Sequence, residues 1–207
     1  SLESVSKELV STEGTIRRFQ ETGYFEEFSN LAENLNSDGL YLNRGYILIS
    51  TGSLNDVGSL NDLECLNKNT WDKRSSIITT YYLKYTDPRT KYATMSDVDS
   101  ISTYAERIAN VIDEVKECTG SSKVNIIAHS MGGLVAREYI EHKGGENSVN
   151  KLIMLGTPNH GINPDMYAWY TEFCDRAHPG QECTDMGYNS PFIKNLKNCA
   201  GSDPAQI

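Results

Sequence analysis

A serine lies in the middle of the stretch KVNIIAHSMGGLVAREYI, which runs from residue 123 to residue 140. A serine hydroxyl is a weak nucleophile at neutral pH, so Ser130 needs a base at hydrogen-bond distance and an exposed position from which it can reach an acyl carbonyl. The residues two before and two after it, Ala128 and Gly132, are small, as a tight strand-to-helix turn requires. The pattern A-x-S-x-G therefore predicts a nucleophile elbow. The alternative is that Ser130 only caps the following helix.

The segments on either side of Ser130 must position it. Residues 123–128 (KVNIIA) form a short apolar run, which is typical of a strand buried on both faces. Residues 131–145 (MGGLVAREYIEHKGG) predict a helix that ends at two glycines. Its apolar residues fall on one side: Leu134, Val135, Tyr139 and Ile140. The turn directs the backbone N–H of Met131, at the helix N-terminus, toward a developing oxyanion, so we expect Met131 to be one oxyanion donor.

Three further apolar or β-branched runs predict strands at 45–50, 76–85 and 151–155. Residues 100–120 predict a helix with Gly120 as its stop. Apolar residues repeat along it at helical spacing: Ile101, Ala105, Ile108, Ile112 and Val115. Strands alternating with helices indicate an α/β fold with a mostly parallel sheet and flanking helices. Functional groups in such sheets gather at the carboxyl ends of the strands.

We expect residues 1–207 to form a single domain, because a chain of 207 residues can bury a substantial core. Residues 1–45 are predicted to be a helical N-terminal segment, with helical spacing near 16–35, and residues 46–160 the parallel-sheet core. From about residue 161 the helical spacing is lost and the sequence becomes rich in Asn, Asp, Gly, Pro, Cys and aromatic residues. Residues 161–199 are therefore predicted to be an ordered cap or lid.

Three motifs resemble a known family. AHSMGGLVAR (128–137) resembles the nucleophile elbow of α/β-hydrolase lipases, and LGTPNHG (155–161) resembles the loop that follows their next strand. ECTDMGYNSPFIKNLKN (182–198) is similar to a pattern in secreted bacterial triacylglycerol lipases of class 2. Lecithin–cholesterol acyltransferases and inositol deacylases share parts of it. The resemblance covers roughly residues 98–199, and it implies an α/β-hydrolase fold with a cysteine-containing cap.

The resemblance implies a serine carboxylic-ester hydrolase that acts on lipid or other acyl esters. Ser130 would attack the carbonyl, a histidine would move the proton, and a carboxylate would orient that histidine. A second oxyanion donor normally follows a His-Gly pair, but Thr51–Gly52 stands at the equivalent strand end, which makes Ser53 the candidate. In a rival alignment, the helix near 16–35 follows that strand, which then lies upstream of the chain.

The base is harder to place. In this superfamily the carboxylate and then the histidine follow the serine. After residue 161 the chain holds one histidine, His178, and its last residues, AGSDPAQI, resemble the approach to the carboxylate-bearing strand. We therefore expect an incomplete hydrolase domain whose acid and base lie beyond Ile207. Alternatively, His178 is the base and is oriented by one of three carboxylates: Asp165, Asp175 or Asp185.

The remaining histidines have other predicted roles. In the family His129 packs or hydrogen-bonds beneath the elbow, His142 falls on the polar side of its helix and should be solvated, and His160 should fix the GTPNHG loop. The aromatic stretch 166–173 (MYAWYTEF) either lines an acyl pocket or packs the cap down.

Composition excludes several classes. The formal charge is 19 − 28 = −9 without a basic face, which argues against nucleic acid as a partner. No run approaches the roughly 18 apolar residues of a membrane span, although transient contact with a lipid interface fits a lipase. The first residues, SLESVSKELV, lack the features of a targeting peptide, so we expect any such peptide to have been removed.

The five cysteines form no CxxC pair, and no histidine stands at metal spacing, so no metal or other cofactor is predicted. We expect Cys174 and Cys183 to be bonded and the protein to be secreted or extracytoplasmic. The alternative is a set of free thiols in a cytosolic protein. A second hypothesis for function, a non-catalytic binding or scaffolding protein on the same frame, rests on the missing base and on the unusual TGS sequence at 51–53.

Overall fold

The computed structural model describes residues 26–48, 71–80, 83–87, 92–95, 99–163, 165 and 180–196. Among these it does not place the side chains of 26, 27, 29, 45–48, 77–80, 83–87 and 92–95. The chain divides into two compact units. One comprises Ser1–Ser96 with Asn110–Ser122, and the other comprises Asp97–Ala109 with Lys123–Ile207. The single domain expected over 1–207 stays a prediction.

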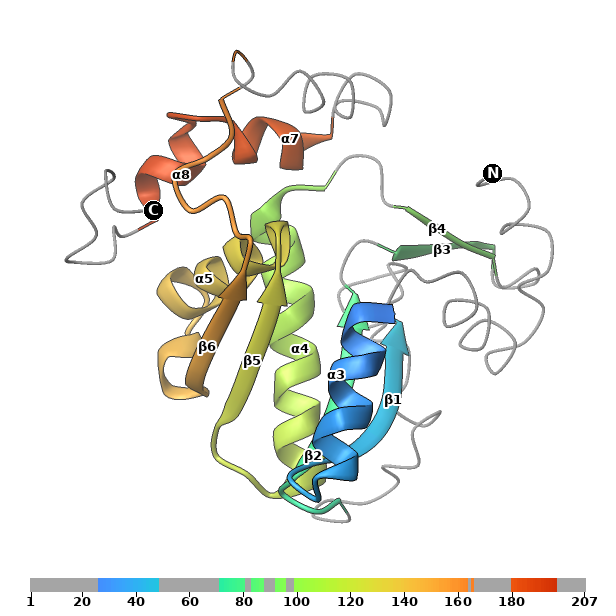
Figure 1. The fold of residues 1–207 in the computed structure, drawn as a ribbon. Helices are drawn as coiled ribbons and strands as arrows, with labels where there is room; N and C mark the ends of the chain where they lie inside the picture. The colour runs from blue at the N-terminus through green and yellow to red at the C-terminus, as the bar shows by residue number, and fades with distance from the viewer. Residues whose placement is uncertain are drawn as a thin grey trace. The chain divides into compact units, whose positions relative to one another are not determined.

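The first unit holds helix α3 (Glu26–Ser37) and a parallel pair of strands, β1 (Leu42–Leu48) and β2 (Ser75–Thr80) (Figure 1). The helix forms where apolar residues recur at helical spacing: Phe28, Leu31, Ala32 and Leu35. It ends at Ser37, and the turn after it contains Gly39, whose φ of 67° is costly for other residues. The N–H of Leu40 and that of Tyr41 then donate to the carbonyl of Leu35. The helical spacing predicted near 16–35 is confirmed from residue 26 onward, and residues 1–25 lie outside the described part of the chain.

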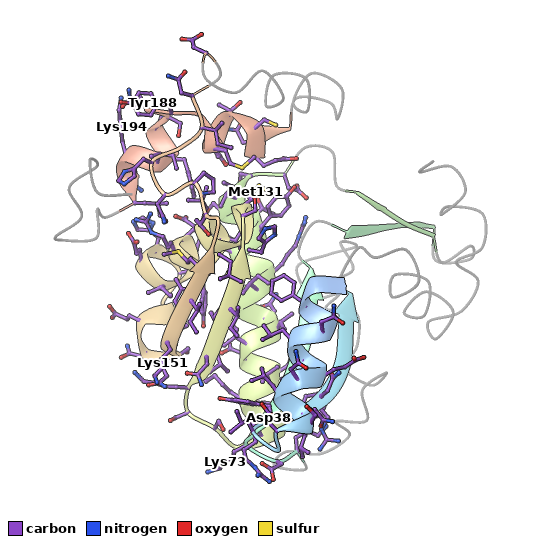
Figure 2. The ribbon with its side chains drawn as sticks, viewed as in Figure 1. Asp38, Lys73, Met131, Lys151, Tyr188 and Lys194 are labelled. Carbon is purple, nitrogen blue, oxygen red and sulfur yellow. The ribbon has the colours of Figure 1, made fainter. Side chains whose placement is uncertain are left out.

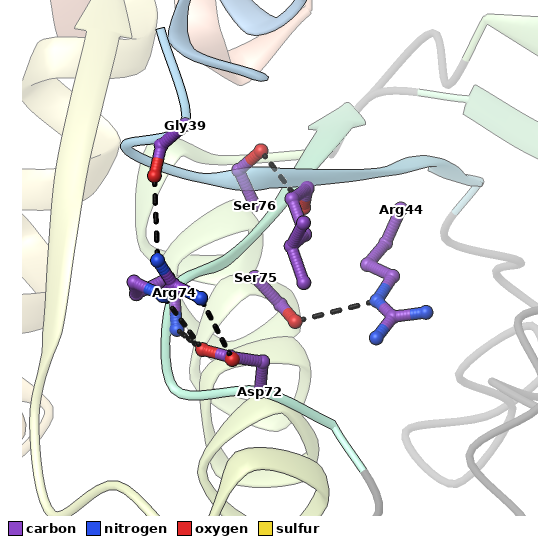
Figure 3. Close-up of polar contacts among 7 residues, drawn as sticks. Gly39, Arg44, Asp72, Arg74, Ser75 and Ser76 are labelled. Atoms are coloured by element: carbon purple, nitrogen blue, oxygen red, sulfur yellow. Dashed lines mark hydrogen bonds and ion pairs between the residues drawn. The ribbon is translucent and has the colours of Figure 1, made fainter. Parts of the chain in front are cut away.

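Polar contacts of Asp72, Arg74 and Ser75 hold the start of β2 (Figure 3). The Arg74 guanidinium pairs with Asp72 at 3.2 Å and donates to the carbonyl of Gly39. Arg44 donates to the Ser75 hydroxyl at 3.3 Å, and its guanidinium carbon lies 5.5 Å from the centre of the buried Trp71 ring. The hydrogen bonds of Arg74 to Gly39 and of Arg44 to Ser75 join residues 35 and 31 positions apart in the sequence, so they help to hold β1 beside β2.

The strand predicted at 76–85 is wrong in its extent. The structure has two strands there, β2 and β3 (Leu83–Asp87), and β3 pairs in antiparallel fashion with β4 (Tyr92–Met95), which the sequence did not predict. A continuous β-branched and aromatic run carries no internal turn signal. The partner of each strand, β1 for β2 and β4 for β3, decides where the run divides.

Helix α4 (Ile101–Thr119) contributes to both units. Its predicted apolar stripe is confirmed, since Ile101, Ala105 and Ile112 are buried. Gly120 follows it with a φ of 64°, as predicted for the stop. At its start, the Ser100 hydroxyl accepts from the N–H of Thr103 at 3.1 Å. No helix in the described part of the chain combines the length and the apolar character that a membrane span requires.

The second unit contains the strand–helix–strand order around Ser130. Strands β5 (Val124–His129) and β6 (Val149–Leu155) are parallel, and helix α5 (Met131–His142) and the short 3-10 helix η2 (Gly145–Asn147) connect them (Figure 1). The predicted strands and helix are confirmed. The predicted one-sided burial of α5 is wrong, because every residue from Gly133 to Tyr139 is buried, including the charged Arg137 and Glu138.

The segment after residue 180 forms two short helices, α7 (Gln181–Met186) and α8 (Pro191–Asn195). Ser190 begins α8: its hydroxyl accepts from the N–H of Ile193 at 3.0 Å, and Pro191 occupies the first turn. Apolar residues of the two helices are buried, Met186 in α7 and Ile193 in α8, and so is Leu196, which follows α8. This part of the region predicted as a cap therefore has its own helices and a small core.

Helix α7 is attached to the start of α4 through two carboxylates. Asp185 accepts from the backbone N–H of Ile101 at 3.0 Å and from the side-chain amide of Gln181 at 2.9 Å. Glu182 hydrogen-bonds the hydroxyl of the fully buried Tyr104, and its Oε2 is buried without a hydrogen-bond partner. Burial raises the pKa of Glu182, although its own backbone N–H and Tyr104 act in the opposite direction.

The pH dependence of stability should report the Glu182 contact. Because the pKa of Glu182 is raised in the folded state, the folded protein binds more protons than the unfolded chain, and stability should fall as pH rises above the ordinary value of 4.5. Glu182→Gln should flatten this decline in urea unfolding measured between acidic and neutral pH. Tyr104→Phe removes a hydrogen bond that lowers this pKa, so it should extend the decline to higher pH. Parallel curves for all three proteins would contradict the assignment.

Candidate active site

Ser130 occupies the turn between β5 and α5 with an unusual backbone conformation, φ 52° and ψ −128°. A positive φ at a residue other than glycine costs about 1–3 kcal/mol and persists only when the surroundings enforce it. The residue is exposed, and its hydroxyl makes no capping hydrogen bond to α5. Ser130 is therefore not an ordinary helix cap, and its geometry is that expected of a serine held at a sharp elbow.

Backbone hydrogen bonds on both sides hold this conformation. The N–H of Ser130 donates to the carbonyl of Leu155, the last residue of β6, at 2.8 Å. Its carbonyl accepts from the N–H of Gly133 at 3.1 Å, which closes the first turn of α5. Ser130 thus continues the β5–β6 pairing on one side and starts the helix on the other.

Met131 is the first residue of α5 and lies at the carboxyl end of β5, whereas Lys151 lies at the opposite end of the strand pair (Figure 2). The first N–H groups of a helix have no acceptor within it. The N–H of Met131 therefore falls among the donors that α5 cannot use itself. This is where the sequence predicted the oxyanion donor, and the positive end of the helix dipole favours an anion there.

Small residues let the turn pack closely, and the structure adds one that the sequence reasoning missed. Ala128 is buried, as the elbow pattern requires. A Cβ built on Gly133 would lie 2.0 Å from the hydroxyl oxygen of Thr157. The second glycine of the SMGG sequence is therefore needed because α5 and the loop after β6 touch at this point.

Arg137 joins α5 to the same loop. The residue is only 5% exposed, and its Nη1 donates to the side-chain oxygen of Asn159 at 3.1 Å and to the Asn159 carbonyl at 3.5 Å. Its Nε donates to Glu141, one turn further along α5, at 3.2 Å. One contact therefore joins the VAR sequence of the elbow motif to the PNH sequence of the loop motif. The sequence offered a signal for it, since an arginine lies among the apolar residues of the predicted helix.

The end of the loop is joined to the segment between α7 and α8. Ile162 pairs with Gly187: the N–H of Ile162 donates to the Met186 carbonyl at 2.8 Å, and the N–H of Tyr188 donates to the Ile162 carbonyl at 2.9 Å. Gly161 has a φ of 80°, and a Cβ on it would lie 2.8 Å from the Gly187 carbonyl oxygen. The last glycine of GTPNHG is therefore required for two reasons: its positive φ and the close approach of the Gly187 backbone.

The described histidines lie in three different environments. His129 is exposed, because it alternates along β5 with the buried Ala128 and faces the other way. His142 is exposed, as predicted, and its Nδ1 also lies 2.7 Å from Oε2 of the buried Glu138, one turn earlier on α5. His160 is half-buried in the loop beside Asn159, which contacts α5, and its expected role in fixing the loop stays a prediction.

The other predicted site residues are divided between described and undescribed parts of the chain. Asp165 is exposed, and Asp185 is buried with both carboxylate oxygens accepting hydrogen bonds, so it serves as a cap for α4. Ser53, Asp175, His178 and the aromatic stretch 166–173 lie outside the described residues. The described residues therefore bring together Ser130, Met131 and the loop 156–161, and leave the base and the second oxyanion donor as predictions.

Comparison with known proteins gives one family and two structures. Residues 60–200, more than half of the chain, match the family model described as palmitoyl protein thioesterase. The lipase B of Aspergillus fumigatus has 15% identity, covering 78% of this chain and 34% of its own, with a TM-score of 0.42. The mature lipase BlEst2 of Bacillus licheniformis has 18% identity, covering 72% of this chain and 55% of its own, with the same TM-score. The chain thus spans about a third of the length of the first lipase and about half of the length of the second.

Two glycines of equal conformation separate the effect of φ from that of contact. Gly144 and Gly161 both have a φ of 80°, but only Gly161 has backbone atoms within 3 Å of a built Cβ, and Gly144 has open space. Gly144→Ala should cost about 1–2 kcal/mol of unfolding free energy for its left-handed conformation. Gly161→Ala should cost about 1–3 kcal/mol more, for overpacking. Urea denaturation would measure both, and equal losses would show that the contact contributes nothing.

Proposed function

Since the chain belongs to the palmitoyl protein thioesterase family of the α/β-hydrolase superfamily, we propose that it forms the nucleophile-bearing part of a serine hydrolase that cleaves acyl thioesters or esters. The observation that carries the proposal is the backbone of Ser130. It is an exposed serine with a positive φ, held between a parallel strand and the N-terminus of a helix. A strained conformation of this kind is maintained where function requires it.

In the proposed reaction the Ser130 oxygen attacks the acyl carbonyl carbon, and a base accepts the hydroxyl proton. The bond to the leaving sulfur or oxygen then breaks, the leaving group takes up a proton, and an acyl-serine ester remains. Water, deprotonated by the same base, attacks this ester and releases the fatty acid and the serine. The N–H of Met131 would hold the oxyanion in both steps, because it lies next to the nucleophile at the positive end of α5.

The family and the lipase resemblance point to different leaving groups, and chemistry separates them. A thiol has a pKa of about 8.5, so a thiolate can leave with little help from an acid. An alkoxide is a far stronger base and must be protonated as it leaves, so ester cleavage depends more on a correctly placed histidine. A lipid acyl group in either substrate is consistent with this site. We favour the thioester because the family match covers more than half of the chain.

Two sources for the base remain. His178 is the candidate within the chain, and a histidine from a segment beyond Ile207 is the other. The described histidines fit the role less well. His142, for example, lies at the end of a helix of 12 residues that starts next to Ser130, or about 18 Å away at 1.5 Å per residue.

We also propose an extracytoplasmic location. Cys118 and Cys183 are both disulfide-bonded, and disulfides persist in oxidising compartments. Cys174, the expected partner of Cys183, lies outside the described residues. Mass spectrometry of a non-reduced digest should recover a peptide pair joining Cys174 and Cys183, whereas a free Cys174 thiol would refute this pairing.

Labelling with a fluorophosphonate probe tests the nucleophile and the base together in the complete protein. Ser130→Ala should abolish labelling and lower hydrolysis of an acyl thioester by roughly 10⁴-fold or more. Ser122→Ala, at an exposed serine eight residues earlier, should leave both unchanged. His178→Asn should abolish labelling if His178 is the base and preserve it if the base comes from elsewhere.

The same measurement separates the enzyme from a non-catalytic scaffold. If the folded wild-type protein stays unlabelled while a known serine hydrolase reacts under the same conditions, the enzymatic proposal fails. The binding or scaffolding hypothesis would then be preferred. Labelling that persists in Ser130→Ala would instead move the nucleophile to another residue.

A further inference from the structure

We propose that Arg137 is a positioning residue for Ser130, which it holds in its reactive conformation by clasping the loop 156–161. This inference rests on the proposed function, because it concerns the same nucleophile. Arg137 lies seven residues after Ser130 on α5, and we infer that it acts only through Asn159 and the loop. Nothing in the elbow pattern itself assigns it a role.

The contacts form a closed ring of the chain. From Ser130 the ring follows α5 to Arg137, crosses through the guanidinium to Asn159, and runs back along the loop to Leu155. The carbonyl of Leu155 accepts the N–H of Ser130 at 2.8 Å and closes the ring. One end of the loop therefore fixes the backbone of Ser130, and its middle is fixed to the helix that Ser130 begins.

A ring of this kind explains how the strain at Ser130 survives. A non-glycine residue with a φ of 52° relaxes unless several contacts hold it at once. The loop has little freedom to compensate, because Thr157 lies against Gly133 and Gly161 lies against Gly187. Without the contact between Arg137 and Asn159, which we call the clasp, the Leu155–Gly156 peptide can shift. The Leu155 carbonyl, which accepts the N–H of Ser130, then shifts with it.

Burial makes the clasp strong and specific to arginine. Arg137 is 5% exposed, and a buried guanidinium must have its charge and its donors compensated. Its Nη1 serves both oxygens of Asn159, while Nε serves Glu141 from the side of the helix. A lysine carries the charge as a single point on a flexible stem and cannot reproduce this fork. The contact with Asn159 therefore depends on the shape of the guanidinium as well as on its charge.

The experiment removes the loop side of the clasp, so that the buried arginine is not itself replaced. In the complete protein, Asn159→Ala should slow fluorophosphonate labelling and lower kcat for a chromogenic p-nitrophenyl ester by about tenfold to a hundredfold, since a displaced nucleophile costs rate. KM should change far less. Asn159→Asp keeps an acceptor for Arg137 and should restore most of the rate, and Arg137→Lys should behave like Asn159→Ala.

Lys143→Met is the matched control. It removes an ion pair at the C-terminal end of α5, the contact of Lys143 with Glu106 at 2.6 Å, which does not involve the loop. It should leave the labelling rate unchanged when all variants are assayed well below their unfolding temperatures. A folded Asn159→Ala protein with the wild-type rate, or an equal loss in Lys143→Met, would overturn the positioning role. An unlabelled wild type would overturn the proposed function, and the positioning role with it, before any variant is compared.

Discussion

The positive φ of Ser130 is the constraint on which the rest of the second unit depends. A serine leaves this conformation when it is free to do so, because a side chain with a Cβ is strained there by about 1–3 kcal/mol. Three features oppose the relaxation: the pairing of β5 with β6, the start of α5, and the loop that follows β6. Each is an ordinary element, and only their combination holds an exposed hydroxyl at the end of a parallel strand pair.

Two glycines near Ser130 allow neighbouring segments of the chain to pack closely. Gly133 admits Thr157, and Gly161 admits the backbone of Gly187. The three sequence motifs are therefore parts of one packed junction: the elbow contacts the GTPNHG loop, and the loop contacts the segment between α7 and α8. The palmitoyl protein thioesterase match, which spans residues 60–200, includes all three.

Much of this arrangement could be predicted from local patterns. The elements 100–120, 123–128, 131–145 and 151–155 follow apolar periodicity and glycine stops, and the structure has them close to those bounds. The division of 76–85 into two strands could not be predicted, because strand partners decide it. The position of Arg137 among apolar residues gave a signal for its burial, but its partner Asn159, 22 residues later in the chain, could not be predicted from helical spacing. The catalytic base is a different case. The order of residues in the superfamily places it after the serine, but this order does not say which residue it is.

The two attachments of α7 differ in their chemistry, and this difference bears on the site. On the side of the loop the bonds are between neutral backbone groups, those of Ile162 with Met186 and Tyr188. On the side of α4 they depend on Asp185 and on Glu182, whose pKa is raised mainly by burial. A rise in pH therefore weakens the attachment to α4 while the hydrogen bonds to the loop keep their strength. Since the loop contacts are the ones that reach Ser130, ionisation of Glu182 acts directly on the attachment to α4 and not on the hydrogen bonds that hold the backbone of Ser130.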